Sequence, residues 1–271
     1  MISKEANAVV VQKIELAPGL IKLRVVPDGW ELPDFTAGQY SLLGLPGSAP
    51  RHPSSEAEEV PADAKKLILR AYSVASSSMA KEYLEFYISM VRSGALTPRL
   101  MNLNIGDKLW LSTHFSGMFT MSDVSYEFNV VLIATGTGVA PYMSMIRTEA
   151  EEGIRHRFAV IHGARHSWDL GYHAQLITLD KLSKNFSYIP IISDAHDEPV
   201  PWKGHTGFVQ KIWRDGVLDK AWDFHPTSKD THIFLCGNPH MIDDMIKLLE
   251  KEGFREQTRD VPGNIHLERY D

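Results

Sequence analysis

The hydrophobic pattern of this chain changes once, near residue 125, and this change constrains the fold more than any other feature of the sequence. Before it, short runs rich in Val, Ile and Leu are separated by turns such as Pro18-Gly19, a pattern typical of antiparallel strands. After it, apolar strands alternate with helix-like runs, a pattern typical of a parallel sheet covered on both faces. We therefore predict two domains, an antiparallel β-barrel over residues 1–124 and an α/β domain with a parallel sheet over residues 125–271.

Individual elements follow from the same pattern. In the first domain we expect strands at residues 8–16, 20–26, 38–43, 66–74, 83–91 and 103–112. In the second domain, expected strands at 129–134, 158–162, 186–192 and 231–236 alternate with expected helices at 142–152, 172–182, 209–215 and 239–252. Asn238 is expected to cap the last helix. Residues 46–65 are rich in Pro, Ser, Ala and Glu and lack an apolar period, so we expect a solvated, mobile loop there.

The composition limits the chemistry that the chain can carry out. Its single cysteine, Cys236, cannot form an internal disulfide or a four-thiolate metal site, so redox chemistry needs an organic cofactor. A net charge of -6 argues against nucleic-acid binding, which relies on concentrated Lys and Arg. No stretch approaches the roughly 18 apolar residues of a membrane span, and the N-terminus lacks a signal-peptide profile, so we expect a cytoplasmic protein without membrane contact.

The first candidate binding segment is Arg70-Ala71-Tyr72-Ser73, at the end of an expected strand. In an extended strand the side chains of Arg70 and Tyr72 project to one face, about 7 Å apart. Such a face suits a ligand with both phosphate and a flat ring, because arginine offers a forked donor to phosphate and tyrosine can stack on a heteroaromatic system. Ser73 can donate to a polar ring edge. Taken alone, so short a motif is more often part of an ordinary surface strand.

Further segments combine glycine with a strand end or a helix start. In Gly94-Ala95-Leu96-Thr97-Pro98, glycine precedes a Thr-Pro pair that opens either an anion-accepting helix end or simply a short capped helix. Residues 134–141 run from an apolar strand through a glycine turn into a helix, a context in which the backbone can approach a pyrophosphate. Cys236-Gly237-Asn238-Pro239 lies at another strand end, although Cys236 can equally be a buried apolar residue. The tail, residues 266–271, can dock its aromatic residue on a ring system or fray in solvent.

Together, in this order and at this spacing, the five segments resemble the bacterial ferredoxin–NADP reductase (flavodoxin/ferredoxin reductase) family over essentially the whole chain. The resemblance implies an FAD-binding barrel, with Arg70 on the flavin nucleotide phosphate, Tyr72 against the isoalloxazine and Ser73 near flavin N5. It implies further FAD contacts from the same strand, the next strand and the second segment: Ala71, Tyr87, Ile88, Ser89, Ala95, Leu96 and Thr97.

The resemblance also implies that the second domain binds NADP(H) or NAD(H). The residues implied to line the pyrophosphate and nicotinamide lie in the glycine turn and are Thr137, Gly138 and Val139. Arg165 is the implied phosphate contact, and Cys236 is implied to lie near the nicotinamide.

The residues that the resemblance implies for catalysis come from three segments. They are Ser73, Cys236, Glu268 and Tyr270. Tyr270 is the implied gate that covers the flavin until nicotinamide displaces it, and Glu268 is its implied proton or charge partner. Many bacterial relatives end in a Trp where this chain has Asp271, so stacking of a terminal indole on the adenine of FAD is not expected.

The choice of coenzyme is where this sequence departs from the family. NADP-specific relatives place basic residues after one strand of the second domain and after a Thr-Gly pair, to hold the 2′-phosphate. This chain has Asp194 and Phe208 at those places. Because a carboxylate repels phosphate and can accept hydrogen bonds from ribose hydroxyls, we do not expect strict NADP specificity. Lys203, Lys211 and Arg214 are close enough in sequence to provide another phosphate contact.

The resemblance implies a monomeric flavoprotein enzyme that exchanges electrons between NAD(P)H and ferredoxin or flavodoxin, met transiently, by hydride exchange at flavin N5. A second hypothesis keeps the fold but makes the acceptor an oxygenase component, a free flavin or a ferric chelate. A third is a flavin- or dinucleotide-binding, redox-sensing module without turnover.

Two further expectations concern partner docking and metals. An acidic carrier docks by charge complementarity, so we expect a local basic patch drawn from Lys81, Arg92 and Arg99. His162 and His166 have the spacing of a helical metal pair, but they follow a strand, so no metal site is expected.

Overall fold

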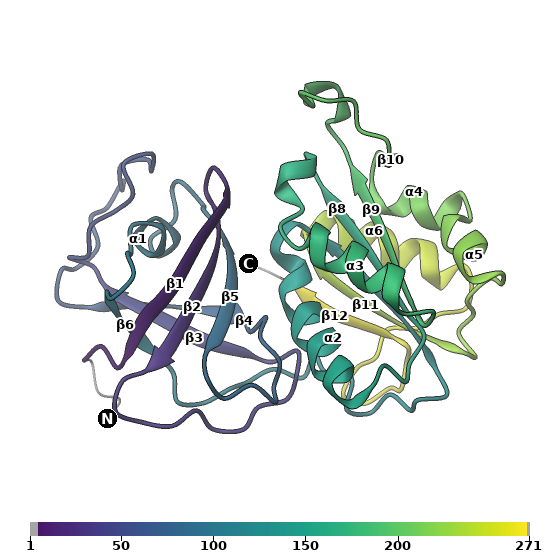
Figure 1. Cartoon of the computed structure of the whole chain (residues 1–271), viewed down its shortest axis with the longest axis horizontal. Helices are drawn as coiled ribbons and strands as arrows, with labels where there is room; N and C mark the ends of the chain where they lie inside the picture. Colours follow the sequence, from purple (N-terminus) through teal and green to yellow (C-terminus); the bar gives the residue numbers. More distant parts are fainter. Residues whose placement is uncertain (1–4, 270–271) are drawn as a thin grey trace. The chain divides into compact units, whose positions relative to one another are not determined.

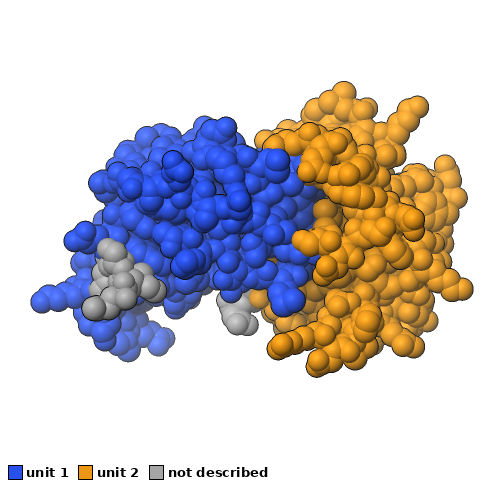
Figure 2. All heavy atoms as spheres, turned by 90° about the horizontal axis from the view of Figure 1, so that it is seen from below, with its two compact units in different colours: residues 1–120, 143–148 blue, residues 121–142, 149–271 orange. Residues whose placement is uncertain are grey.

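The computed structural model describes residues 5–269, which divide into two compact units (Figures 1 and 2). The first unit contains the residues up to 120 together with residues 143–148. The second contains residues 121–142 and those from 149 onward. Each unit has one sheet and a hydrophobic core of its own.

The first unit is an antiparallel β-barrel. Its described strands are β1 (Ala8–Ala17), β2 (Leu20–Pro27), β3 (Tyr40–Pro46), β4 (Leu67–Ser73), β5 (Leu84–Ser89) and β6 (Lys108–Leu111). They lie in the order β4-β3-β6-β1-β2-β5, and a bridge between Val74 and Phe86 joins the two outer strands. Side chains alternate as a half-buried strand requires, so that on β2 Leu23 enters the core while Lys22 and Arg24 lie on the other face. Helix α1 (Thr97–Met101) adds Leu100 to this core.

The second unit is an α/β domain with a fully parallel sheet. Its described strands lie in the order β10-β9-β8-β7-β11-β12. They are β7 (Asn129–Thr135), β8 (Phe158–Ala164), β9 (Phe186–Ile192), β10 (His205–Thr206), β11 (Thr231–Gly237) and β12 (Ile265–Arg269). Residues 130–134 of β7 are all buried, as expected for a strand covered on both faces.

Helices cover this sheet. They are α2 (Ala140–Glu152), α3 (His173–Leu182), α4 (Val209–Arg214), α5 (Val217–Trp222) and α6 (Pro239–Glu250). Helices α4, α5 and α6 pack on one face in a common core with β7, β8 and β11, while α3 lies on the side nearer the viewer in Figure 1. The Asn238 side chain accepts from the amides of His240 and Met241, which confirms the expected cap of α6. Within residues 5–269, no helix is both long and apolar enough to span a bilayer.

The expected fold class is confirmed, and every expected strand and helix is present with ends shifted by a few residues. Two strands and one α-helix were not expected from the sequence, and the first of them, β10, has only two residues. Helix α5 has six residues and follows Gly216 in a left-handed conformation (φ 60°), so it is too short to show a helical period. The tail forms β12, which pairs with β11 through residue 269, so the alternative of a frayed tail is wrong for these residues.

In the loop expected at 46–65, Pro46 still belongs to β3 and residues 47–65 contain no strand or helix, but the loop is not simply solvated. The side chains of Arg51 and Glu58 are mostly buried because they form ion pairs with each other and with buried Arg99. The expectation of a solvated loop is therefore wrong for these residues. A polar composition does not by itself place residues in solvent, because charged side chains can be buried when they are paired.

Candidate functional site

The Arg70-Ala71-Tyr72-Ser73 segment ends β4, which is extended and paired with β3 along its whole length. The Tyr72 ring packs against the barrel core, and burial raises the pKa of its hydroxyl. Arg70 and Ala71 are exposed, while Ser73 is buried. Arg70 Nη1 donates to the carbonyl of Leu69 at 2.7 Å, and no described carboxylate lies within ion-pair distance of Arg70. The strand end thus presents an uncompensated guanidinium on the same face as a half-buried aromatic ring.

The neighbouring strand end carries the second set of candidates. β4 and β5 meet at the Val74–Phe86 bridge, so Ser73 and Tyr87 are the next residues along two adjacent strands. Tyr87 and Ile88 are buried, and Ser89 is exposed. Contacts from Tyr87 and Ile88 to a cofactor remain a prediction.

Residues 91–97 form a loop closed by Thr97, whose Oγ1 accepts from the Val91 amide at 3.0 Å and donates to the Val91 carbonyl at 3.2 Å. The Gly94 carbonyl accepts from Arg51 and the Ala95 carbonyl from Arg99. In a planar trans peptide the N–H points opposite to the C=O, so the Ala95 and Leu96 amides point away from these arginines. Neither amide donates to any described group. Two adjacent unused donors fit a phosphate.

The expected basic patch is wrong at Arg99. That side chain is 3% exposed and is held by Glu58, so it is part of the interior. Lys81 is paired with Asp34 at 2.7 Å, and Arg92 donates through Nε to the Ser54 carbonyl. Arg99 was expected at the surface because Glu58, the carboxylate that pairs with it, is 41 residues away in the sequence.

In the second unit the glycine turn lies at the carboxyl end of β7, as residues 136–139 of a 3₁₀ turn that leads into α2. A Cβ on Gly138 would be 2.4 Å from the Cys236 carbonyl oxygen, so only glycine fits there without a shift. Thr135 Oγ1 accepts from the Asn238 amide at 2.9 Å. The turn and the end of β11 are therefore in backbone contact at the sheet edge where open α/β folds bind ligands.

The contact of His162 with the glycine turn was not predicted from the sequence, in which His162 was considered as half of a metal pair. His162 is fully buried at β8, and its Nε2 lies 3.0 Å from the carbonyl oxygen of Gly136, the first residue of the turn. Its Nδ1 has no described partner, and burial lowers its pKa to about 4. Neutral His162 therefore donates from Nε2 and holds the turn in place. In the part of the chain that the structure describes, no three His, Cys, Asp or Glu side chains gather as a metal site.

The structure brings Cys236 and Glu268 together. They are directly opposite in the β11–β12 register, and Cys236 Sγ donates to Glu268 Oε2 at 3.7 Å. Cys236 is buried. Tyr270, the implied gate, lies outside the described residues.

The coenzyme-selecting candidates lie past the ends of β8 and β9. The Asp194 amide donates to the Arg165 carbonyl at 2.9 Å, so these two residues are neighbours, with Arg165 exposed and Asp194 half-buried. Phe208 is 73% exposed. Further carboxylates lie on the same loops, since Glu198 accepts from both the amide and the hydroxyl of Ser167. The edge thus combines one exposed arginine with several carboxylates.

We expect the free energy of unfolding to fall as the pH drops from about 6.5 towards 4. Burial lowers the pKa of His162 to about 4, and burial with nearby His232 lowers that of His266 to about 4. An unfolded histidine titrates near 6.5, so between these values the unfolded chain binds more protons and unfolding is favoured. Each pKa unit is worth about 1.4 kcal/mol. Urea unfolding at pH 7 and pH 5 measures the loss.

His162→Gln should reduce this pH dependence, because glutamine can still donate to Gly136 but does not titrate. His205→Gln, at an exposed position, is the matched control and should leave the pH dependence unchanged. An equal pH dependence in wild type and His162→Gln would contradict the assignment.

Comparison with known proteins finds similarity to oxidoreductases. Residues 132–247 match the family model described as an oxidoreductase NAD-binding domain. The chain is 27% identical over 237 residues to the flavodoxin/ferredoxin–NADP reductase of Buchnera aphidicola, covering 87% of this chain and 88% of the relative. It is 30% identical to the reductase component of phenol 2-monooxygenase from a Pseudomonas species, covering 94% of this chain and 65% of that protein.

A solved structure shows the same fold. It is a ferredoxin NADP+ reductase from Neisseria gonorrhoeae with bound FAD and NADP, with a TM-score of 0.79 and 23% identity, and the match covers 98% of this chain and 99% of that one.

Proposed function

We propose that this chain, which is similar over most of its length to bacterial ferredoxin–NADP reductases, is a flavoprotein enzyme that moves electrons between NAD(P)H and a ferredoxin or flavodoxin. It would act as a monomer that meets its carrier transiently. The observation that carries the proposal is the uncompensated Arg70 guanidinium on the same strand face as the half-buried Tyr72 ring. That pair suits a ligand with a phosphate at one end and a flat ring at the other.

FAD is the cofactor proposed for the first unit. Arg70 would bind a phosphate by its forked donors, and Tyr72 would stack on the isoalloxazine. The unused amides of Ala95 and Leu96 would bind phosphate oxygens. The chemistry that FAD supplies when bound is hydride exchange at N5 and release of electrons one at a time.

The nicotinamide dinucleotide is proposed to bind the second unit at the glycine turn. The missing side chain of Gly138 lets the turn pack directly on the backbone of Cys236 and Gly237, and His162 keeps the turn in shape through the Gly136 carbonyl. Cys236, whose thiol donates to Glu268, would line the nicotinamide side.

The coenzyme prediction follows from charge. We expect kcat/KM with NADH to equal or exceed that with NADPH, because Asp194 would repel a 2′-phosphate and can accept from ribose hydroxyls. Asp194→Ser should raise kcat/KM for NADPH about fivefold relative to NADH, since like charges a few Å apart in water interact by about 1 kcal/mol. Glu151→Ser, at an exposed helix position, is the control. A much higher kcat/KM with NADPH in the wild type would refute this prediction.

The test of the function itself is stopped-flow reduction of the purified yellow protein with NADH and NADPH side by side, read at the flavin absorbance. Fast bleaching by either donor supports a reductase. Absence of bleaching in a flavin-containing protein would leave the redox-sensing module in its place.

The second candidate function is the reductase of an oxygenase. The 30% identity to the phenol 2-monooxygenase reductase component favours it. Turnover is measured side by side with ferredoxin, flavodoxin and a ferric chelate as acceptors. A carrier reductase should prefer ferredoxin or flavodoxin to the chelate, and the absence of such a preference would favour the oxygenase reductase.

A further inference from the structure

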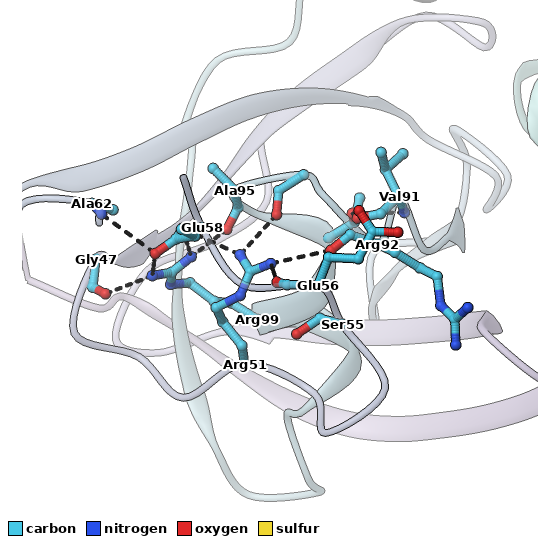
Figure 3. Close-up of polar contacts among 12 residues, drawn as sticks. Gly47, Arg51, Ser55, Glu56, Glu58, Ala62, Val91, Arg92, Ala95 and Arg99 are labelled. Carbon is cyan, nitrogen blue, oxygen red and sulfur yellow. Dashed lines mark hydrogen bonds and ion pairs between the residues drawn. The ribbon is translucent and has the colours of Figure 1, made fainter. Parts of the chain in front are cut away.

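Two arginines and one glutamate tie the segment between β3 and β4, residues 47–66, to the loop at residues 91–97 (Figure 3). Arg99 binds Glu58 with both terminal nitrogens, Nη1 donating to Oε1 at 2.7 Å and Nη2 to Oε2 at 3.1 Å. The same nitrogens donate to the carbonyls of Ala95 at 2.6 Å and Gly47 at 2.7 Å. Arg99 therefore joins α1 and the 91–97 loop to the start and the middle of the 47–66 segment.

Arg51 supplies the second half of this connection from within the 47–66 segment. Its Nη1 donates to Glu58 Oε1 at 3.2 Å and to the Gly94 carbonyl at 2.9 Å. Its Nη2 donates to the carbonyls of Arg92 at 3.1 Å and Glu56 at 2.7 Å. The two arginines together thus bind the carbonyls of Arg92, Gly94 and Ala95 from one side.

Glu58 holds the two arginines in place. In the described residues it is the one carboxylate within ion-pair distance of buried Arg99. The Arg99 guanidinium, through its hydrogen bonds, lowers the pKa of Glu58 to about 2, so the carboxylate stays charged at neutral pH. A buried arginine that loses its partner is strongly destabilising, and Glu58 therefore fixes the position of Arg99 as well as its charge.

The position of these carbonyls decides where the opposite amides point. The peptide planes after Gly94 and Ala95 have their oxygens bound by arginine, so their N–H groups, on Ala95 and Leu96, point to the other side. Inside the loop the described hydrogen bonds are those of Thr97 with Val91 and of the Gly94 amide with the Val91 carbonyl. None of these fixes the Ala95 peptide. Leu96 is anchored in the barrel core, but glycine at 94 adds backbone freedom, and the arginines supply the hydrogen bonds that orient the carbonyls of Gly94 and Ala95.

We propose that the 47–66 segment is a brace for the flavin site, and that Arg51 and Glu58 are positioning residues that keep the Ala95 and Leu96 amides aimed at the pyrophosphate of FAD. The inference rests on the proposed function, which places FAD on this unit. Neither side chain touches the cofactor in this scheme. They act indirectly. The arginines hold the carbonyls of Gly94 and Ala95, and the amides on the opposite side of the same two peptides would bind the cofactor.

The experiment measures the dissociation constant of FAD for wild type, Arg51→Gln and Glu58→Gln by equilibrium titration. Two misaimed charge-assisted hydrogen bonds should raise the dissociation constant roughly 10- to 100-fold in Glu58→Gln and less in Arg51→Gln. Glu58→Asp should restore part of the affinity. Glu59→Gln removes the same charge from the next, exposed residue and is expected to leave the affinity within about twofold of wild type.

The rate of flavin reduction by NADH at saturating FAD separates positioning from general damage. If Arg51 and Glu58 affect only the phosphate end of FAD, their variants should keep this rate within about twofold of wild type. A fall in the rate parallel to the loss of affinity would overturn the proposal, as would unchanged FAD affinity in both variants. Arg51→Gln keeps the Glu58–Arg99 pair, so it decides the question if Glu58→Gln fails to fold. If wild type binds no FAD, the proposed function fails instead.

Discussion

Replacing Glu85 with alanine is expected to lower the free energy of unfolding by about 3 kcal/mol, the low end of the range for breaking a buried ion pair. Glu85 on β5 is 1% exposed, and its carboxylate accepts from Arg24 Nε at 2.7 Å and from Arg147 Nη1 at 2.7 Å. Removing it leaves two guanidinium groups without this partner. Because both arginines reach water in part, the loss should not exceed that low end.

Lys22 is a third cation of the same cluster. Its side chain faces the same cluster from β2, and burial lowers its pKa to about 8, with Glu85 acting against that shift. Without Glu85, three cations share a partly buried surface, and the pKa of Lys22 should fall further. Urea unfolding of Glu85→Ala measures the loss, and Glu82→Ala, at an exposed position nearby, is the control. Equal midpoints for the two variants would show that the cluster does not stabilise the barrel.

Gly138→Ala is expected to lower kcat/KM for NAD(P)H about 100-fold while flavin content stays unchanged. A Cβ there would be 2.4 Å from the Cys236 carbonyl oxygen and 2.9 Å from Gly237 Cα, so the turn or the end of β11 must shift. A displacement of about 1 Å at a reacting site can cost about 100-fold in rate. The barrel is not involved, so FAD should remain bound. Steady-state kinetics and the ratio of flavin to protein absorbance provide the two measurements.

Gly136→Ala is the matched control two residues away. Its Cβ would meet nothing within 4 Å, but its φ of 54° is left-handed, so alanine there costs about 1 kcal/mol. It should therefore lower kcat/KM much less than Gly138→Ala. If the two variants behave alike, the contact with Cys236 has no special importance for the dinucleotide reaction.

Much of the fold could be predicted from the sequence because its signals are local. Strand alternation on β2 and the βα rhythm after residue 125 depend on neighbours within a few residues, and they gave the correct architecture. The same holds for the cap at Asn238 and for the shared face of Arg70 and Tyr72, which follows from an extended strand. Helix α5 was missed because six residues are too few to show a period.

The tertiary structure alone decided which distant residues meet. Cys236 and Glu268 were both singled out, but their contact depends on the parallel register of β12 on β11, which the sequence does not encode locally. The spacing of His162 to His166 did not indicate its contact with the glycine turn, since its partner is a backbone carbonyl 26 residues away. Charged residues were read as exposed because an unpaired charge is costly to bury. Arg99 is buried because packing brings Glu58 to it, and long-range pairing of this kind is a property of the folded chain.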